Sequence, residues 1–322
     1  MIVPKKLKKG SHIRVIAPSR SLGIIGQDCR KIAIERLAEM GLSVSFGKNV
    51  EENNKFCSSS VQSRLDDLHE AFADTSVDAI LTAIGGFNST ELLAQVDYDL
   101  IGKNPKILCG FSDITALCNA ITAQTGMVTY SGPHFSTFGM LNGLEYTIEY
   151  FKKCFFQTDA FELLPSSSWS DDEWYLNQEK RKFVKNDGPW VIRAGKAEGR
   201  IVGGNLGLFD ELKGTSYFPD IRDSILFLEH CAEQEVWVFN RNLQALALHP
   251  DFKKVKALVL GRFEPQNEMN RALLEEILLS KKELEGLPIV ANVDFGHTTP
   301  IFSFPIGGRG IVDVSRIFLT EF

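Results

Sequence analysis

The sequence has no apolar segment of about 20 residues, the length that a membrane-spanning helix needs. Its basic first residues, MIVPKKLKKG, are not followed by the apolar run of a signal peptide. An excess of basic residues is also missing, because 35 Lys and Arg against 41 Asp and Glu leave a net charge of −6. We therefore expect no membrane partner and no nucleic acid as the main partner, since neutralising phosphates requires surplus Lys and Arg.

Common cofactor and metal motifs are absent as well. None of the six cysteines forms a C-x-x-C pair: Cys29, Cys57, Cys109, Cys118, Cys154 and Cys231. We interpret them as reduced thiols, mostly small buried hydrophobic residues, in a reducing compartment. Neither G-x-G-x-x-G nor a P-loop occurs, so a dinucleotide or ATP site is weakly supported. We expect no metal, no cofactor and a cytoplasmic location.

The first half alternates two kinds of apolar pattern. Continuous runs that predict buried strands lie at 12–19, 77–84, 106–110 and 127–131. Helical spacing of apolar residues predicts helices at 30–40, 60–73 and about 113–124. This alternation indicates βαβ units and a doubly wound, mostly parallel sheet, so the fold class is α/β. Ligands of such sheets bind beyond the carboxyl ends of the strands, which makes each strand-to-helix loop a candidate site.

A polar segment at 165–190 interrupts this alternation and contains three of the four tryptophans. At 322 residues the chain is long for one core, so we place a boundary here. The expected parts are an N-terminal domain (1–164), a Trp-rich loop (165–190) and a C-terminal β-rich α/β domain (191–322). In the last part we expect strands at 224–229, 255–261 and 288–295, helices around 234–248 and 268–284, and a Gly-rich β tail.

Ser112 lies in ILCGFSDIT, where a predicted strand gives way directly to a helix. This is the geometry of a nucleophile elbow, which lifts the hydroxyl clear of the sheet. The next backbone N–H, that of Asp113, can then point at a developing oxyanion. The second glycine of G-x-S-x-G is missing. The alternative is that Ser112 only caps the following helix, and the local sequence does not decide between the two.

Two histidines follow predicted strands in Gly- and Pro-flanked loops, His134 in SGPHFS and His297 in DFGHTTP. His297 is favoured as a base because the long apolar strand before it would hold its loop on a rigid support. A serine hydrolase also needs an acid that fixes the imidazole tautomer. Glu229 ends the apolar strand ILFLE and is the best-placed carboxylate in the second half, although a glutamate there is more often a cap or a surface group.

Two adjacent glycines, Gly85 and Gly86, follow the strand at 77–84. They let the backbone approach a ligand closely and can supply a second oxyanion donor. A phosphate cradle is possible in principle, but no phosphate-binding motif accompanies them. Ser89 is a candidate N-cap for the helix expected next.

These segments resemble the LD-carboxypeptidase family of serine peptidases from roughly residue 10 to the C-terminus. Six stretches carry the resemblance in order: LTAIGGFNSTELL, NPKILCGFSDITAL, TYSGPHFSTFGM, EGRIVGGNLGLF, SILFLEH and DFGHTTP. The chain is most similar to the MccF-like branch, the microcin C self-immunity peptidases, because of GGFNS, GFSDITAL and the Trp-rich segment. One departure is His230, where we would expect an acidic residue, and it puts the substrate contacts of that loop in doubt.

The resemblance implies the roles of five residues. Ser112 would be the nucleophile, His297 the base and Glu229 the acid, while the backbones of Gly86 and Asp113 would bind the oxyanion. It also implies a doubly wound N-terminal domain, a β-rich α/β C-terminal domain, a site between them and commonly a homodimer. The implied chemistry is metal-free hydrolysis.

Three functions remain open on these grounds. The leading one is an MccF-like hydrolase that cleaves an amide bond in a small peptide or an aminoacyl-nucleotide of the microcin C type. The alternative within the same chemistry is a muramoyltetrapeptide LD-carboxypeptidase of murein recycling. The third is a non-catalytic ligand-binding module that retains the fold, against which the presence of all three triad candidates counts.

The tryptophans of the 165–190 segment are candidates for substrate recognition. Trp174 is the leading aromatic contact, because stacking on a nucleobase requires an available ring. Asn205, in the GGN turn after the loop, is a second candidate contact. The alternative is that Trp169, Trp174 and Trp190 pin the loop onto the second domain.

Overall fold

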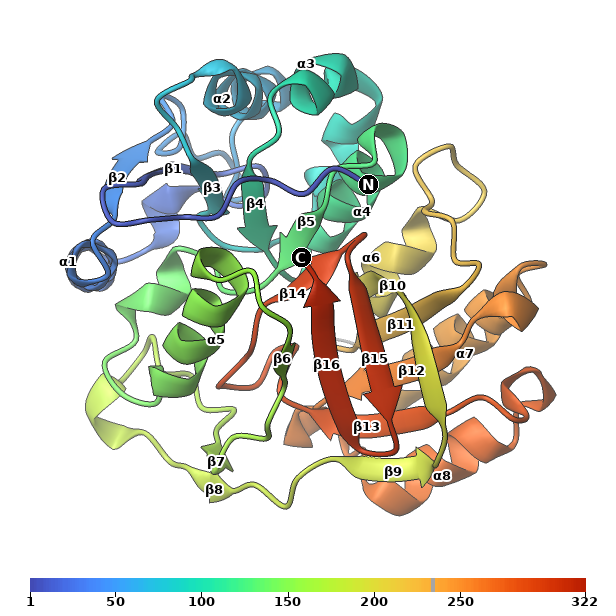
Figure 1. Ribbon diagram of the computed structural model, residues 1–322. Coiled ribbons are helices and arrows are strands. Elements are labelled where there is room, and N and C mark those ends of the chain that lie inside the picture. The colour runs from blue at the N-terminus through green and yellow to red at the C-terminus, as the bar shows by residue number, and fades with distance from the viewer. Residues whose placement is uncertain (233–234) are drawn as a thin grey trace.

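Figure 1 shows the computed structural model, in which residues 1–232 and 235–322 are described. The first of its two large sheets lies in the upper half of the figure. Within these residues the strand order is β14-β5-β4-β3-β1-β2, parallel from β2 to β5, with β14 antiparallel to β5. The strands are β1 (His12–Ile16), β2 (Ser43–Phe46), β3 (Ala79–Thr82), β4 (Ile107–Gly110), β5 (Thr129–Ser131) and β14 (Phe304–Ile306). Because helices cover parallel sheets, β3, β4 and β5 are continuous apolar or small runs, buried throughout.

The strand order reverses between β1 and β3. From β1 the chain moves outward to β2, whereas from β3 it moves the other way to β4 and β5. A crevice forms at the carboxyl ends of two strands where the order reverses, and α/β sheets bind ligands there. The loops after β1 and β3 lie at this point and carry Arg20 and the Gly85–Gly86 pair.

Helices surround this sheet, and α4 connects it to the second one. α4 is buried from Ile114 to Ile121 and stops at Gly126, which has a left-handed φ of +71°. Asn119 of α4 donates to the Gly203 carbonyl at 2.8 Å. The helices of this part are α1 (Gln27–Glu39), α2 (Val61–Ala73), α3 (Tyr98–Lys103), α4 (Ile114–Thr125) and α5 (Glu145–Phe156).

The second sheet occupies the lower half of Figure 1. Its order among the described residues is β6-β16-β15-β10-β11-β12-β13-β9, parallel from β10 to β13 and antiparallel elsewhere. Its strands are β6 (Phe161–Glu162), β9 (Trp190–Arg193), β10 (Lys196–Asn205), β11 (Ser224–Glu229), β12 (Ala257–Gly261), β13 (Ile289–Val293), β15 (Arg309–Asp313) and β16 (Arg316–Glu321). Its helices are α6 (Leu206–Glu211), α7 (Val236–Ala247) and α8 (Arg271–Leu279).

The remaining elements are short. β7 (Ser168–Trp169) and β8 (Val184–Lys185) pair antiparallel within the Trp-rich segment. The short 3-10 helices of the described residues are η1 (Leu22–Ile24), η2 (Ser89–Gln95), η3 (Ser136–Gly139), η4 (Gln178–Lys180), η5 (Phe252–Lys254), η6 (Pro265–Asn267) and η7 (Lys282–Leu284).

The 165–190 segment is fixed to the second sheet on both sides of His297. Ser170 and Thr299 exchange two backbone hydrogen bonds of 2.7 Å. The Ser166 hydroxyl donates to Asp294 Oδ1 at 2.9 Å, and Arg262 Nη1 donates to the same oxygen at 2.6 Å. Arg262 and Asp294 are buried, so each neutralises a charge that would otherwise be costly to bury.

The predicted fold class is confirmed: a mostly parallel, doubly wound N-terminal sheet is followed by a β-rich α/β part. The domain boundaries stay a prediction. Two strands cross them in the pairing, since β6 of the N-terminal half pairs with β16 of the second sheet and β14 of the C-terminal half pairs with β5 of the first. The helix expected from residue 234 is α7, which starts at Val236; residue 234 lies outside the described residues. Among the described residues no helix combines the length and apolarity needed to cross a membrane.

Two local expectations were wrong. The segment after Gly86 is the 3-10 helix η2 with Asn88 as N-cap, because the Ser89 hydroxyl donates instead to the Asp113 carbonyl at 2.7 Å. The helix expected at 268–284 is divided into α8 and η7. Lys281 leaves the helical conformation between them, and its buried ammonium group donates to Asn240.

Candidate active site

Ser112 occupies the turn between β4, which ends at Gly110, and α4, which begins at Ile114. Its φ of +59° lies in the left-handed region that residues with a Cβ rarely adopt. Backbone strain of this kind is concentrated at functional sites and is typical of a nucleophile elbow. The N-cap position of α4 belongs to Asp113, so Ser112 is not the helix cap of the alternative interpretation.

His297 lies between Ser112 and Glu229. Its Nε2 is 3.0 Å from Ser112 Oγ, and its Nδ1 is 2.7 Å from Glu229 Oε2. The carboxylate can only accept, so Nδ1 carries the proton and Nε2 is left to accept the hydroxyl hydrogen of Ser112. The structure thus brings together the three predicted side chains in the order of a Ser-His-Glu triad. Their catalytic roles stay a prediction.

Glu229 ends β11 and is 4% exposed. Burial by itself would raise its pKa, but the neighbouring His297 and hydrogen bonds from His297 and Asn205 hold the pKa below the ordinary value. Asn205 Nδ2 donates to the second carboxylate oxygen at 3.0 Å. Gly296 lies against this side chain, since a Cβ there would lie 3.0 Å from Glu229 Cβ and 3.1 Å from Glu229 Oε2, and its φ of +108° also favours glycine.

The two predicted oxyanion donors are close to Ser112 along the chain or through a neighbour: Asp113 is the next residue, and Gly86 follows Gly85, whose Cβ position lies 3.2 Å from Ser112 Oγ. Among the described residues, the backbone N–H groups of Gly86 and Asp113 donate to no other backbone group. Gly86 is in close contact with the loop after β1, because a Cβ there would lie 2.3 Å from Ser19 Oγ and 2.7 Å from Arg20 Cγ. These contacts leave no room for a side chain and let the backbone approach a ligand.

The Asp113 carboxylate holds the glycine loop against the nucleophile turn. Its Oδ2 accepts hydrogen bonds from the backbone N–H groups of Asn88 at 3.1 Å and Ser89 at 2.9 Å. The Ser19 hydroxyl donates to the same oxygen. Asp113 is fully buried, so these bonds are not weakened by solvent. Sequence reasoning considered only the backbone of Asp113 and missed this carboxylate and Ser19; an acidic residue directly after the candidate nucleophile was the available signal.

His134, the other histidine in a strand-end loop, lies behind Ser112 in the wall of the site. Its ring stacks on Phe111, with centroids 4.4 Å apart, and Nδ1 is 2.6 Å from Thr82 Oγ1. Burial, together with the charges of His297 and Arg20, lowers its pKa to about 3. The ring is therefore neutral at physiological pH, and the structure places His297, not His134, between the serine and the glutamate.

A pocket of about 420 Å³ opens over Ser112 and His297. The first sheet contributes the loops after β1, β3 and β4, and the second contributes those after β11, β12 and β13. Trp174 and Asn205 both line this pocket, so the structure brings the two predicted substrate contacts to the site. Asn205 also supports Glu229 and accepts from the Leu208 N–H at 3.3 Å as the N-cap of α6. A substrate contact by either residue stays a prediction.

Comparisons with known proteins agree with this geometry. Residues 13–132 match the LD-carboxypeptidase N-terminal domain, and residues 198–312 match the LD-carboxypeptidase C-terminal domain. The chain belongs to the LD-carboxypeptidase family. Within this peptidase family it is 49% identical to YocD of Bacillus subtilis, which carries a carboxypeptidase name, over 98% of both chains.

Further comparisons place the chain in the MccF-like branch of this family. It is 31% identical to the microcin C7 self-immunity protein MccF of Escherichia coli, over 89% of this chain and 87% of that protein. The crystal structure of an MccF-like protein from Bacillus anthracis has a TM-score of 0.98 at 50% identity and full coverage of both chains. A structure of MccF in complex with glutamyl sulfamoyl guanosine has a TM-score of 0.91 at 29% identity, covering 100% and 99%.

Proposed function

We propose that this protein is a serine hydrolase of the MccF-like branch that cleaves an amide bond through Ser112, His297 and Glu229. The observation that carries the proposal is the continuous chain of hydrogen bonds from Ser112 Oγ through the imidazole to the buried carboxylate. Since the three side chains come from both sheets, this order is produced by the fold as a whole.

The first half of the reaction acylates the serine. His297 Nε2 takes the hydroxyl proton as Ser112 Oγ attacks the substrate carbonyl, and Glu229 stabilises the imidazolium that forms. The N–H groups of Gly86 and Asp113 would donate to the negative oxygen of the tetrahedral intermediate. His297 then gives the proton to the leaving amine.

The second half releases the acyl group. His297 accepts a proton from water, the resulting hydroxide attacks the acyl-enzyme carbonyl, and the proton returns to Ser112 Oγ as the C–O bond breaks. Neutral His134 behind the serine adds no positive charge that would compete with the imidazolium.

The substrate class that we propose is an aminoacyl-nucleotide of the microcin C type or a small peptide. Its support is the position of Trp174 in the lining of the pocket, where a ring can stack on a base, and the structure of MccF with glutamyl sulfamoyl guanosine. The competing class is a murein tetrapeptide, which the LD-carboxypeptidase family name favours. A side-by-side hydrolysis assay with an aminoacyl-sulfamoyl adenosine and a muropeptide separates the two.

The enzyme class is tested with a fluorophosphonate probe, which labels activated serines. We expect the wild-type protein to be labelled at Ser112 and the Ser112→Ala variant not to be labelled. A wild-type protein that stays unlabelled would favour the non-catalytic binding module and end the hydrolase proposal.

We also propose that the enzyme acts in the cytoplasm as a homodimer. The buried thiols of Cys109, Cys118 and Cys154 suit a reducing compartment, and a dimer is what the family resemblance implies. Size-exclusion chromatography with light scattering would measure the oligomeric state, and a monomer at micromolar concentration would contradict this part of the proposal.

A further inference from the structure

Arg20 lies at the point where the strand order of the first sheet reverses. It follows β1 in the loop that faces the Gly85–Gly86 loop after β3. Its Nε donates to the Gly85 carbonyl at 3.1 Å, and its aliphatic stem lies against Gly86. The guanidinium group is therefore held beside a proposed oxyanion donor, in the crevice where α/β sheets bind ligands.

The pocket over Ser112 carries many carboxylates and little positive charge. Of the described residues that line it, Arg20 is the one with a Lys or Arg side chain, whereas the lining acids are Asp171, Asp172, Glu173 and Glu264. Asp172 is paired with Arg181 at 2.8 Å, so an anionic ligand entering this pocket is repelled mainly by Asp171, Glu173 and Glu264 and is attracted by Arg20. Only a group that lies next to the glycine loop can reach it.

No described carboxylate neutralises the guanidinium group of Arg20. Within residues 1–232 and 235–322 it has no carboxylate within ion-pair distance. Its carbon lies 5.6 Å from the ring centroid of Phe87, which is 68% exposed. Arginine can bind a carboxylate or a phosphate-like group with two parallel hydrogen bonds, so this side chain retains donors for a ligand.

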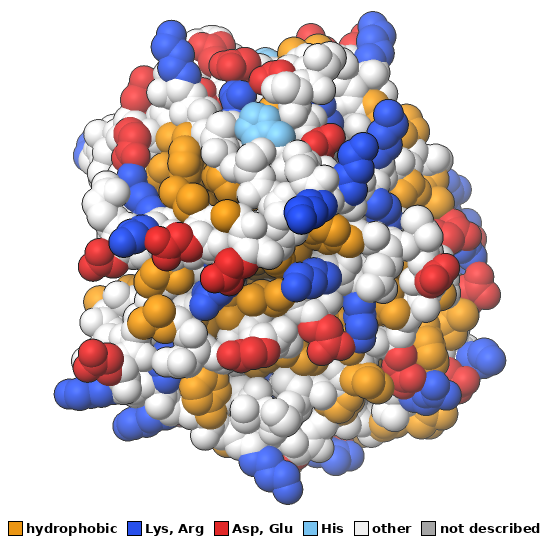
Figure 2. Space-filling model, turned by 60° about the vertical axis from the view of Figure 1, so that its left-hand side comes forward, with side chains coloured by type: hydrophobic (Ala, Val, Ile, Leu, Met, Phe, Trp, Pro, Cys, Tyr) orange, Lys and Arg blue, Asp and Glu red, His pale blue; other side chains and the backbone are white. Residues whose placement is uncertain are grey.

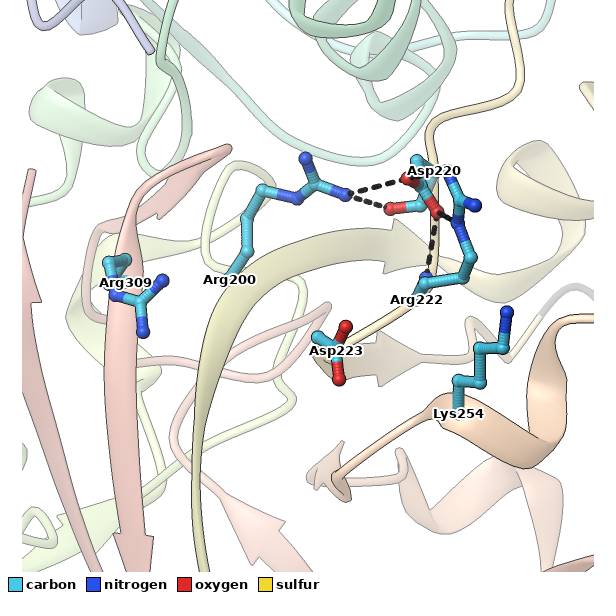
Figure 3. A pocket seen from close by; sticks show the side chains of 6 residues that line it. All are labelled: Arg200, Asp220, Arg222, Asp223, Lys254 and Arg309. Carbon is cyan, nitrogen blue, oxygen red and sulfur yellow. Dashed lines mark hydrogen bonds and ion pairs between the residues drawn. The ribbon is translucent and has the colours of Figure 1, made fainter.

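Another charged hollow of the molecule, of about 480 Å³, shows the opposite arrangement (Figure 3). Its basic residues are paired with neighbouring acids. Arg222 bonds both carboxylate oxygens of Asp220 at 2.8 and 2.6 Å, Arg200 contacts the same carboxylate, and Arg309 pairs with Glu198 at 3.0 Å. These basic side chains form ion pairs with neighbouring acids at an exposed surface, so the hollow gives no reason to expect an anionic ligand.

We propose that Arg20 binds an anionic group of the substrate next to the scissile amide, and so acts as a specificity-determining residue. This inference rests on the proposed function. A peptide that is cleaved by a carboxypeptidase carries a carboxylate two bonds from the scissile nitrogen. An aminoacyl-sulfamoyl or aminoacyl-phosphoramidate nucleotide carries an acidic group directly on that nitrogen. Both place an anion close to the oxyanion site, and Arg20 is the side chain that can neutralise it.

The experiment compares matched charged and neutral substrates. One arm uses a short peptide with a free C-terminal carboxylate and the same peptide with a C-terminal amide. The other uses an aminoacyl-sulfamoyl adenosine and a neutral amide of the same amino acid. The variants are Arg20→Met, which keeps the stem against Gly86, and Arg20→Lys, which keeps the charge. Lys31→Met is the control, because Lys31 is an exposed cation on α1.

We expect Arg20→Met to lower kcat/KM about 10- to 100-fold on the charged member of at least one pair and by less than about threefold on its neutral partner, because one charged hydrogen-bonding contact is lost. Arg20→Lys should recover part of the loss, and Lys31→Met should match the wild type. The arm that responds identifies the anion as carboxylate or sulfamoyl.

Equal losses on charged and neutral partners would overturn the inference, since they would mean that Arg20 only supports the glycine loop. So would an unchanged ratio of charged to neutral kcat/KM in Arg20→Met. Fluorophosphonate labelling of Ser112 is measured in parallel. Absent labelling of the wild type defeats the proposed hydrolase, whereas equal labelling of wild type and Arg20→Met with an unchanged ratio defeats the role of Arg20 alone.

Discussion

The two sheets supply the active site in different ways. The first contributes the Ser112 side chain from a left-handed turn and the two N–H groups that we propose as oxyanion donors, with Gly86 in close contact with Ser19 and Arg20. The second contributes side chains, Glu229 from the end of β11 and His297 from the loop after β13, with Asn205 as a hydrogen-bonding support. The first half is therefore sensitive to an added atom at Gly86 as well as to loss of the Ser112 hydroxyl, whereas the second depends mainly on the chemical groups of Glu229 and His297.

The face in Figure 2 shows no comparable division, because acidic and basic side chains are interspersed around apolar patches. The pocket differs, since its described lining has four acidic residues and one arginine. The contrast between the two sheets is therefore local to the site, and variants at the site are the way to test it.

Changing the reacting groups should give the largest effect. Ser112→Ala, His297→Ala and Glu229→Gln should each remove most activity, on the order of 10⁴-fold or more for the serine. The double Ser112/His297 variant should be scarcely worse than either single one, because the triad acts as a unit. The measurement is kcat/KM on whichever substrate the wild type hydrolyses. Near-normal turnover by Ser112→Ala would contradict a serine mechanism.

Adding one methyl group to the first sheet's loop should give the next largest effect. Gly86→Ala would place a Cβ 2.3 Å from Ser19 Oγ, so the loop must shift. The N–H group of residue 86 would then no longer point at the oxyanion. We expect kcat to fall about 10²- to 10³-fold, the effect of losing one oxyanion donor. The control is Gly26→Ala, because Gly26 has φ −58° and no atom within 4 Å of its Cβ position. A fully active Gly86→Ala variant would contradict the backbone's role.

The Trp-rich segment should matter for one substrate class only. Trp174→Ala should weaken nucleotide-bearing substrates by about 1–3 kcal/mol if the ring stacks on a base, while a short peptide without a base is spared. Trp169→Ala is the contrast, because that ring packs 5.1 Å from Arg262 and fixes the segment. The readouts are kcat/KM on both substrates and the melting temperature. Equal losses on both substrates with a lower melting temperature would make Trp174 structural as well.

Sequence patterns predicted the parts of the molecule that depend on a local period. The apolar runs around β3, β4 and β11 and the amphipathic α2 follow from residue order, because burial selects the same residue types at regular spacing. The three residues of the proposed triad were singled out because each follows or ends such a run. Whether the three side chains contact one another depends on how the two sheets pack. The expectation that they form one triad came from the family resemblance.

Contacts between distant loops could not be predicted in this way. The acidic residue after Ser112 could be noticed in the sequence, but its partner Ser19 could not, nor could the contact of Asp294 with Ser166 of the Trp-rich segment. A buried carboxylate finds its donors in three dimensions, so its partners have no fixed sequence spacing. For the same reason Ser89 was misjudged as a helix cap, since its hydroxyl has a partner across the turn.

The smallest expected effect concerns His134, the buried one of the two strand-end histidines, and is measured through protein stability and not through activity. Burial lowers the pKa of His134 to about 3 in the folded state, against 6.5 for an ordinary histidine. The folded protein therefore binds fewer protons than the unfolded chain between these values. The contribution of neutral His134 to the free energy of unfolding is therefore complete above pH 6.5. It is lost as pH falls toward 3, by up to about 1.4 kcal/mol per pH unit.

His134→Phe removes the titrating group and keeps a ring that can stack on Phe111. We expect its free energy of unfolding, measured by urea denaturation from pH 7 to 4.5, to fall less steeply than that of the wild type. The absolute stability at pH 7 can drop, because Thr82 loses its ring partner, so the slope and not the midpoint is the test. His249→Gln, remote from the pocket, serves as the control. A variant with the wild-type slope would show that His134 does not stay neutral in the folded protein, and the positive charge in the wall behind Ser112 would then have to be included in the acid–base chemistry of His297.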